Sequence, residues 1–167
     1  MNIFYLHPNP KTCALFHCDK HINKMMLEYT QILSTAHRLI SGDDYCEKNG
    51  ITYSKAFENH PSTVWARTST SNYAWLYNLY CWVHTEWVRR HNKTVSHSCF
   101  QFWDQLSVIP NIENKKWSQP PQCMPDEYKQ DDSMLAYRAY YLGEKMYMAK
   151  WKNTPIPDWI PEEKLCF

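Results

Sequence analysis

The chain has 167 residues, the size of one ordinary globular domain and enough to bury a hydrophobic core. Its 18 Lys and Arg nearly balance 17 Asp and Glu, so the formal charge of +1 gives no overall field that would draw the protein onto a polyanion. Three Gly are too few for a glycine-rich phosphate loop or a series of tight β-hairpins. Because 16% of the residues are aromatic, a core can still form, and we expect one domain over residues 1–167.

The first predicted elements are an extended segment and a long helix. Residues 2–6 form a short apolar run that stops at the Pro-rich turn of residues 7–10. From Cys18 to Ile40 apolar residues recur every three or four positions, which is the helical period. Asp19 is the expected N-cap of this helix, and Gly42 is the expected stop.

Further helices are predicted after a polar loop. Residues 41–59 show no sustained period and indicate a loop with one helical turn, and His60-Pro61 opens the next structured stretch. From Asn72 to His91 the helical spacing returns, with Ser71 as the expected N-cap. A third, short segment spans residues 98–106.

The last third of the chain is predicted to wrap around this body. Residues 110–132 contain four Pro and many polar residues, which favours an ordered surface excursion. Asp132 and its neighbours then cap a helix from Met134 to Trp151 that ends near Asn153, and an extended tail follows whose Trp159 docks on the core. The predicted fold is therefore mainly α, with about three principal helices, long ordered loops and an aromatic C-terminal tail.

Seven Cys is an odd number, and none of them forms a Cys-x-x-Cys pair. Since no secretory segment precedes them, we expect reduced thiols and a cytoplasmic location, which for a viral protein is the host cytoplasm. The apolar runs fall short of the roughly 18 residues that a membrane span requires, so no membrane partner is expected.

A polar stripe on the first long helix is the main candidate for a functional surface. An α-helix turns by about 100° per residue, so the side chains of this stripe, from His21 to Thr35, project into a band about 80° wide that runs beside the apolar face. Such a position is half-buried, and burial shifts the pKa values of carboxylates and imidazoles toward those suited to proton transfer. The same spacing also fits plain surface pairs between Glu28 and its neighbours. The stripe consists of His21, Lys24, Glu28, Gln31 and Thr35.

A second group of candidates follows the loop. His60, Trp65 and Arg67 bring an imidazole, a flat ring and a guanidinium together, which is typical of a pocket for a base and a phosphate. The alternative is structural, with Pro61 starting a helix, His60 capping it and Trp65 packing in the core.

Metal binding has one candidate, in which His17, Cys18 and His21, with Cys13 nearby, would supply thiolate and imidazole ligands. No second ligand pair completes a tetrahedral set. We therefore expect neither a metal nor a cofactor.

The order Asp19-Lys20-His21, with Glu28 seven residues after the His, resembles the pyrimidine-dimer DNA glycosylases of the phage endonuclease V type. The resemblance implies base excision from DNA, with Glu28 in the acid/base role and His21 beside it helping to bind the substrate. In that family the amine of a Thr exposed by Met removal attacks C1′ to form an imine.

The chain departs from the family pattern at three places. Leu27 and Gln31 stand where the family has two Arg residues, and the chain begins Met1-Asn2, a pair that normally keeps its Met. Without the α-amine of residue 2, Glu28 is still expected to activate water, as in a monofunctional hydrolase. We expect part of the lost phosphate contact to be replaced by Lys24, Arg67, Arg89, Arg90 and Lys93.

Two functions compete on these residues. The first is an enzyme that holds a DNA base between aromatic rings while Glu28 assists cleavage of the N-glycosidic bond. The second is a viral protein that sequesters or degrades a free or cyclic nucleotide, such as a host defence signal, and the near-neutral charge favours it. A structural protein that reuses the helical scaffold is a third possibility.

Overall fold

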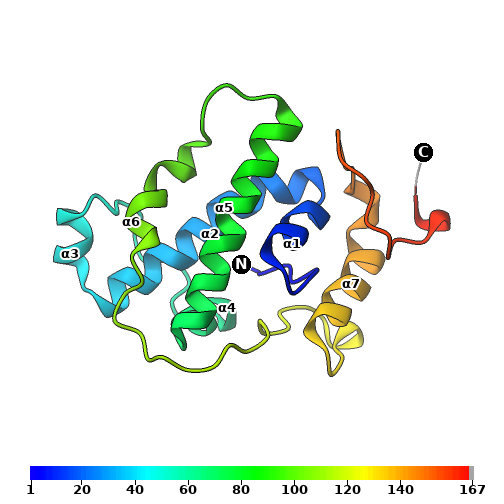
Figure 1. The fold of residues 1–167 in the computed structure, drawn as a ribbon. Helices are drawn as coiled ribbons and strands as arrows, with labels where there is room; N and C mark the ends of the chain where they lie inside the picture. Colours follow the sequence, from blue (N-terminus) through cyan, green and yellow to red (C-terminus); the bar gives the residue numbers. More distant parts are fainter. Residues whose placement is uncertain (166–167) are drawn as a thin grey trace.

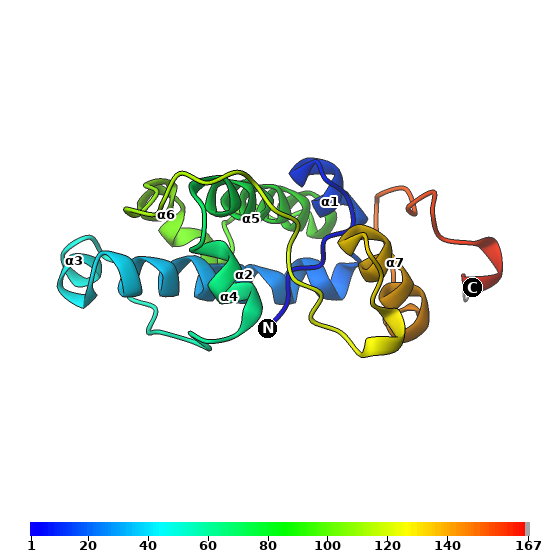
Figure 2. The same ribbon diagram turned by 90° about the horizontal axis from the view of Figure 1, so that it is seen from below.

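Two long helices, α2 (Asp19–Ile40) and α5 (Thr70–His91), form the centre of the fold of residues 1–165, which the computed structural model describes. The two helices pack against each other as two layers, as Figure 2 shows. On α2 the buried side chains repeat at the helical period, because one face must leave water to meet α5. The helical spacing in the sequence therefore predicted both helices correctly.

Shorter elements surround this pair (Figure 1). The α-helices are α1 (Pro10–Phe16), α3 (Asp43–Lys48), α4 (Pro61–Ala66), α6 (Trp103–Ser107) and α7 (Ser133–Glu144). The 3₁₀ helices are η1 (Ser98–Phe102), η2 (Asp126–Tyr128), η3 (Met146–Met148) and η4 (Glu162–Lys164). Within residues 1–165 there is no β-strand, so the mainly α class is confirmed, with α2, α5 and α7 as the principal helices.

The N-terminal segment runs extended through the middle of the protein. Ile3 and Leu6 are fully buried, and Phe4 and Tyr5 are nearly so. Helix α1 follows directly; the sequence was expected to turn at residues 7–10, and no helix was expected after that turn. The sequence contains two helix-start signals here. The Asn9 side chain caps the helix by accepting a hydrogen bond from the Thr12 amide, and Pro10 occupies the first helical position.

Two of the expected N-caps are wrong. Cys18, not Asp19, caps α2, and the Asp19 carboxylate instead accepts hydrogen bonds from Arg90 and from the backbone amide of Lys152. Helix α5 begins after Ser69 rather than Ser71. The Ser69 hydroxyl also donates to the carbonyl of residue 115, and this tertiary contact selects one cap among four consecutive Ser and Thr residues.

Helix α7 ends at Glu144, not near Asn153 as expected. Beyond it the chain leaves the helical path because its backbone makes tertiary hydrogen bonds. The carbonyl of Lys150 accepts from the amide of Asp19 at 2.8 Å, and the amide of Lys152 donates to the carboxylate of Asp19. These bonds replace the ones that a longer helix would have formed.

Three further expectations on the loops and the tail are confirmed. Helix α3 is the single turn in the polar loop, and Gly42 at the end of α2 has φ of +89°. The excursion of residues 110–132 is ordered and packs on the body, where the amide of Ser118 donates to Asn72. Trp159 in the tail contacts the rings of Phe16 and Tyr141 edge to face.

Arg90 joins three elements at the centre of the protein. Its guanidinium is fully buried and donates to Glu86 on α5, to Asp19 on α2, and to the carbonyls of Leu15 and His17 at the end of α1. The distances are 2.7 to 3.1 Å. Each of the three guanidinium nitrogens, Nε, Nη1 and Nη2, donates to an acceptor, so the charge of Arg90 is compensated despite its burial.

No helix among residues 1–165 is long and apolar enough to cross a membrane.

We predict that Arg90→Ala lowers the free energy of unfolding by about 3 to 5 kcal/mol, because two carboxylates and two carbonyls each lose the buried donor that joins them. Urea unfolding followed by circular dichroism measures this. The neighbouring Arg89 also binds Glu86, but 43% of its side chain is exposed. Arg89→Ala should therefore cost no more than about 1 kcal/mol, and equal losses in the two variants would contradict the central role of Arg90.

Candidate functional site

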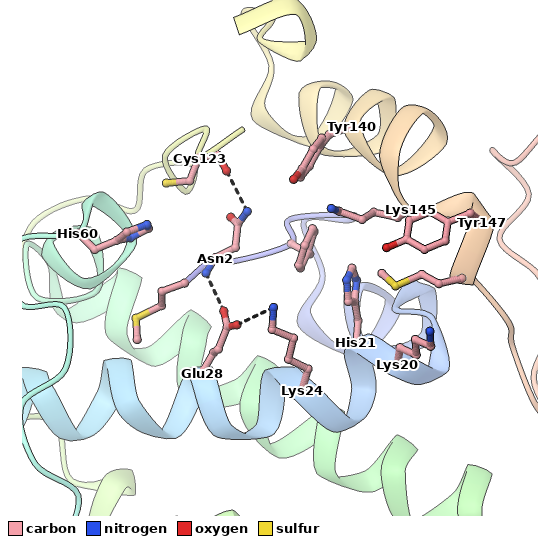
Figure 3. A pocket seen from close by; sticks show the side chains of 13 residues that line it. Asn2, Lys20, His21, Lys24, Glu28, His60, Cys123, Tyr140, Lys145 and Tyr147 are labelled. Carbon is pink, nitrogen blue, oxygen red and sulfur yellow. Dashed lines mark hydrogen bonds and ion pairs between the residues drawn. The ribbon is translucent and has the colours of Figure 1, made fainter. Parts of the chain in front are cut away.

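A cavity of about 670 Å³ opens between α2, α7 and the N-terminal segment (Figure 3). A cavity of this volume accommodates a ligand the size of a nucleotide. Figure 3 shows Lys24, Glu28 and His21 reaching into it from α2, with Tyr140 and Lys145 on the α7 side and His60 opposite. Its lining residues are Met1, Asn2, Phe4, Lys20, His21, Lys24, Glu28, His60, Cys123, Tyr140, Lys145, Tyr147 and Met148.

Glu28 is the carboxylate of this cavity. Its side chain is 12% exposed, and Oε1 lies 3.3 Å from the ammonium of Lys24, one helical turn earlier. Oε2 accepts a hydrogen bond of 2.8 Å from the backbone amide of Asn2. The carboxylate is thus held from both sides but still faces the cavity, as a group that exchanges protons with a ligand must.

Asn2 is fixed beside Glu28 by its side chain. The amide nitrogen of the side chain donates to the carbonyl of Cys123, and its oxygen accepts from the hydroxyl of Tyr137 at 2.6 Å. These two contacts come from segments more than 120 residues further along the chain. The position of the Asn2 backbone nitrogen next to Glu28 is therefore set by the tertiary structure.

His21 forms part of the cavity wall as a neutral ring. It stacks on Phe4, with ring centroids 4.1 Å apart, and its Nδ1 lies 2.7 Å from the hydroxyl of Tyr141. That hydroxyl accepts from the amide of Cys18 and has one proton of its own to donate. In the tautomer that accepts this proton at Nδ1, Nε2 carries the ring proton and can donate to a ligand.

The pKa of His21 is strongly lowered, to about 3. Burial is the main cause, and the charges of His17, Lys145 and Lys24 add to it. His21 is therefore uncharged at neutral pH and acts as a hydrogen-bond donor rather than as a cation.

Lysine side chains give the cavity its positive charge. Lys20 and Lys24 come from α2, and Lys145 comes from the end of α7. The Lys145 ammonium lies 4.5 Å from the centre of the Tyr140 ring, a cation–π contact that places it over the cavity wall. With one carboxylate and three ammonium groups, the cavity favours an anionic ligand.

His60 lines the cavity and also caps a helix. Its Nδ1 accepts from the amide of Ser62 at the start of α4, so the structural role foreseen for it is real. Burial lowers the pKa of His60, the positive N-terminus adds to this, and Glu28 opposes it. The ring faces the cavity in Figure 3, and so one residue serves both purposes.

The structure does not bring Thr35, Trp65 and Arg67 into this cavity. Trp65 is 7% exposed and donates to Ser118, so it packs in the core. Arg67 donates to the carbonyl of Glu58, and Thr35 is buried and bonded to the backbone of Ala56. The expected pocket for a base and a phosphate between His60, Trp65 and Arg67 is therefore not formed.

Gln31 borders a second, smaller cavity of about 200 Å³ that adjoins the first. Met1, Lys24 and Glu28 line both cavities, so these three residues form the boundary between them. Leu27 and Phe57 complete the lining of the smaller one.

The candidate metal ligands are used in other ways. Both ring nitrogens of His17 have partners, the carbonyl of Cys13 and the hydroxyl of Tyr29. Across residues 1–165, no group of three or more His, Cys, Asp or Glu is placed to hold a metal ion.

Sequence reasoning missed the α7 side of the cavity. Tyr140 and Lys145 lie more than 110 positions after Glu28 and carry no local motif. Tyr147, which is 81% exposed at the cavity, was missed for the same reason. Only the packing of α7 beside the N-terminal segment brings them to Glu28.

We predict that the protein loses stability as the pH falls below about 6.5, because buried histidines cannot accept a proton while folded. The pKa values of His17, His21 and His37 are lowered to about 4, 3 and 4. At pH 5 these rings are neutral in the folded chain and protonated in the unfolded chain, so acid favours unfolding. Each contributes about 1.4 kcal/mol per pH unit in this window.

Urea unfolding at pH 7.0, 6.0 and 5.0 measures this slope. His21→Phe keeps an aromatic ring on Phe4 but removes one titrating group, so its slope should be smaller than that of the wild type by about one proton. An unchanged slope would show that His21 is not held neutral.

A sequence profile of the pyrimidine dimer DNA glycosylase family matches residues 1–105. The match spans more than half of the chain and contains Asn2, His21, Glu28 and His60, whereas Tyr140 and Lys145 lie beyond it. No curated protein and no solved structure matches the chain significantly. The profile match agrees with the resemblance seen around Asp19-Lys20-His21 and Glu28, and the chain belongs to the pyrimidine dimer DNA glycosylase family.

Proposed function

We propose that this protein excises a damaged pyrimidine from DNA by cleaving its N-glycosidic bond, with Glu28 as the acid/base. The observation that carries the proposal is the position of Glu28. It is the carboxylate of a cavity of nucleotide size, it is largely shielded from water, and a backbone nitrogen lies 2.8 Å from it. Family membership supplies the class of reaction.

The substrate nucleotide has to leave the DNA stack to reach Glu28, because C1′ of a paired nucleotide is inaccessible to a group inside a cavity. The ring pair of Phe4 and His21 offers an apolar wall for the extruded nucleotide, and Nε2–H of His21 donates to one of its oxygens. Lys24 and Lys145 compensate the charge of the adjoining phosphates.

Glu28 stabilises the positive charge that develops at C1′ and accepts the proton of the nucleophile that attacks there. As the bond to the base breaks, positive charge develops on the sugar, and a carboxylate at short range stabilises it. The same carboxylate accepts a proton from the attacking nucleophile. Lys24 keeps Glu28 oriented through the ion pair of 3.3 Å.

Which group acts as the nucleophile depends on whether Met1 is still attached. While Met1 is attached, the nitrogen of Asn2 is a peptide nitrogen whose lone pair is delocalised, and it cannot attack C1′. Water activated by Glu28 is then the nucleophile, and the product is an abasic site. Removal of Met1 would place a primary amine where the Asn2 nitrogen now contacts Glu28, and that amine can form an imine with the sugar.

We predict that Glu28→Gln lowers the rate of base release from ultraviolet-irradiated duplex DNA by at least about 100-fold, because general acid–base catalysis is lost. The released base is quantified by mass spectrometry. The amide oxygen of Gln can still accept from Asn2, so folding should be retained. Glu113→Gln changes an exposed carboxylate outside the cavity and should leave the rate unchanged; retained activity in Glu28→Gln would refute the assignment.

We also predict that Asn2→Thr converts a chain that keeps Met1 into one that loses it, because a small second residue permits Met removal. The new amine beside Glu28 should form an imine with the damaged strand, which borohydride reduces to a stable protein–DNA adduct. Mass analysis of the intact protein shows whether Met1 is present. If Asn2→Thr loses Met1 and forms no adduct, the amine of residue 2 in that variant is not in reach of C1′.

A second candidate function is binding or degradation of a free or cyclic nucleotide. The charge distribution favours it, because the net charge is +1 and the positive groups of the cavity are confined to a few lysines. A duplex-binding protein gains affinity from many phosphate contacts and loses it steeply with salt, whereas a single nucleotide needs only two or three. Titration of both ligands at two salt concentrations separates the functions, since tight, salt-insensitive nucleotide binding with DNA left intact would favour the second.

A further inference from the structure

A shallow groove of about 450 Å³, which we call the Trp87 groove, lies next to the cavity at Glu28 and shares Lys20 with it. Figure 3 shows Lys20 at the His21 end of that cavity, away from His60. The other residues of the groove line no part of the cavity and come from the first turns of α2 and from the end of α5. The groove is lined by Asp19, Lys20, Asn23, Trp87, His91 and Lys93.

The indole ring of Trp87 is partly exposed and held in a fixed orientation. Its N–H donates to the side-chain oxygen of Asn23 on α2 at 3.2 Å. The ring also belongs to a column of nearly parallel rings, in which His84 lies at 20° to Trp87 and stacks on Phe100 with centroids 3.6 Å apart. Because the indole is ordered before a ligand arrives, a flat ring that stacks on it pays little of the usual entropy cost.

The end of α5 brings a positive charge to the same ring. Asn92 ends the helix with φ of +48°, and the amide of Lys93 donates to the carbonyl of Val88 at 3.0 Å. This left-handed turn sends the chain back along the helix. The ammonium of the exposed Lys93 therefore lies 5.6 Å from the centre of the Trp87 ring, in a cation–π contact.

The groove carries an excess of positive charge. Its carboxylate, that of Asp19, is already compensated by the Arg90 guanidinium at 3.1 Å and by the amide of Lys152 at 2.9 Å. Of the residues expected to take over phosphate contacts, Arg90 is fully buried in that network, whereas Lys93 is exposed in the groove. Lys20 supplies a second exposed ammonium. A fixed aromatic ring between ammonium groups suits the base and the phosphates of an unpaired nucleotide.

We propose that the Trp87 groove binds one unpaired nucleotide of a DNA strand that runs on toward Glu28. The base stacks on Trp87, Lys93 contacts a phosphate on one side, and Lys20 contacts the phosphate on the side of the cavity. The inference rests on the proposed glycosylase function for the identity of the ligand as DNA, and it extends that function to a nucleotide that is not itself excised. The base has to be unpaired, because a base inside a duplex is stacked on its neighbours and cannot reach the indole.

The stack is tested by anisotropy titration of the whole protein with a labelled, undamaged thymidine oligomer of about 12 nucleotides, alone and paired with its complement. Trp87→Ala should weaken binding of the single strand by about 10-fold, and Trp87→Phe, which keeps a flat ring, by no more than about threefold. Duplex binding should change by less than about twofold, since the bases are paired there. An equal loss for single strand and duplex, or no loss, would refute the stack.

Trp103→Ala is the matched control for the ring column. Trp103 lies at the other end of the column, at 12° to Phe100, and is 50% exposed. Its removal disturbs the column as much as the loss of Trp87 but leaves the groove intact, so single-strand binding should stay at the wild-type value. A 10-fold loss in Trp103→Ala would show that the column as a whole, and not the groove, is responsible, and would overturn the proposal.

The phosphate contact is tested by the salt dependence of single-strand binding. Lys93→Gln should lower the slope of log affinity against log salt by about 0.7, the value of one phosphate contact on a single strand. Lys129→Gln removes an exposed ammonium outside the groove and should leave the slope unchanged. If the slope of Lys93→Gln equals that of the wild type, Lys93 does not contact a phosphate.

A DNA strand and a free nucleotide share the chemistry of base and phosphate, and thymidine monophosphate separates them. It cannot contact both lysines through phosphates on either side of its base, so it should bind at least about 10-fold more weakly than the oligomer. Equal affinities that both depend on Trp87 would identify a free nucleotide as the ligand and overturn the assignment to a strand.

Failure of the groove and failure of the glycosylase proposal give different results, because binding of an undamaged strand requires no base release. If the wild type releases base from irradiated DNA and Trp87→Ala binds the single strand as tightly as the wild type does, the groove is refuted and the glycosylase proposal stands. If the wild type releases no base but binds the single strand in a Trp87-dependent way, the glycosylase proposal fails and the groove stands.

Discussion

The guanidinium of Arg90 is the contact on which the arrangement of the helices depends. It is fully buried, and its donors reach the end of α1, the first residue of α2 and the last turns of α5. Asp19 extends the same network to the chain beyond α7 through the amide of Lys152. A charge in this position is tolerated only while all of these acceptors stay in place, so the network fixes α1, α2, α5 and the C-terminal segment relative to one another.

The candidate site follows from this arrangement. With α1 fixed against α5, the preceding N-terminal segment passes beside the middle of α2, and the amide of Asn2 arrives at Glu28. The turn that sends the chain from α7 back to Asp19 places Lys145 at the cavity. The cavity therefore has no single structural origin. It is the space where three segments, far apart in the sequence, are brought together by contacts outside it.

Two adjoining cavities share Lys24 and Glu28. The larger adds Lys20, Lys145 and the neutral ring of His21, whereas the smaller adds Leu27, Gln31 and Phe57. Leu27 and Gln31 stand where the sequence resemblance expected two Arg residues, so the region next to Glu28 is more apolar and less cationic than in that pattern. For the proposed glycosylase function this lining implies fewer phosphate contacts, and the net charge of +1 agrees with that.

The sequence by itself determined the two long helices and the shared face of His21, Lys24 and Glu28, because helical periodicity is a local property that needs no partner. It did not determine where α7 ends, which Ser caps α5, or that Thr35 and Arg67 fix a loop instead of lining a pocket. Those outcomes depend on hydrogen bonds to residues distant in the chain, such as Lys150 to Asp19 and Ser69 to residue 115. The tertiary structure alone brought Asn2, Lys145 and Phe57 to Glu28, since proximity across more than 20 residues leaves no periodic trace in the sequence.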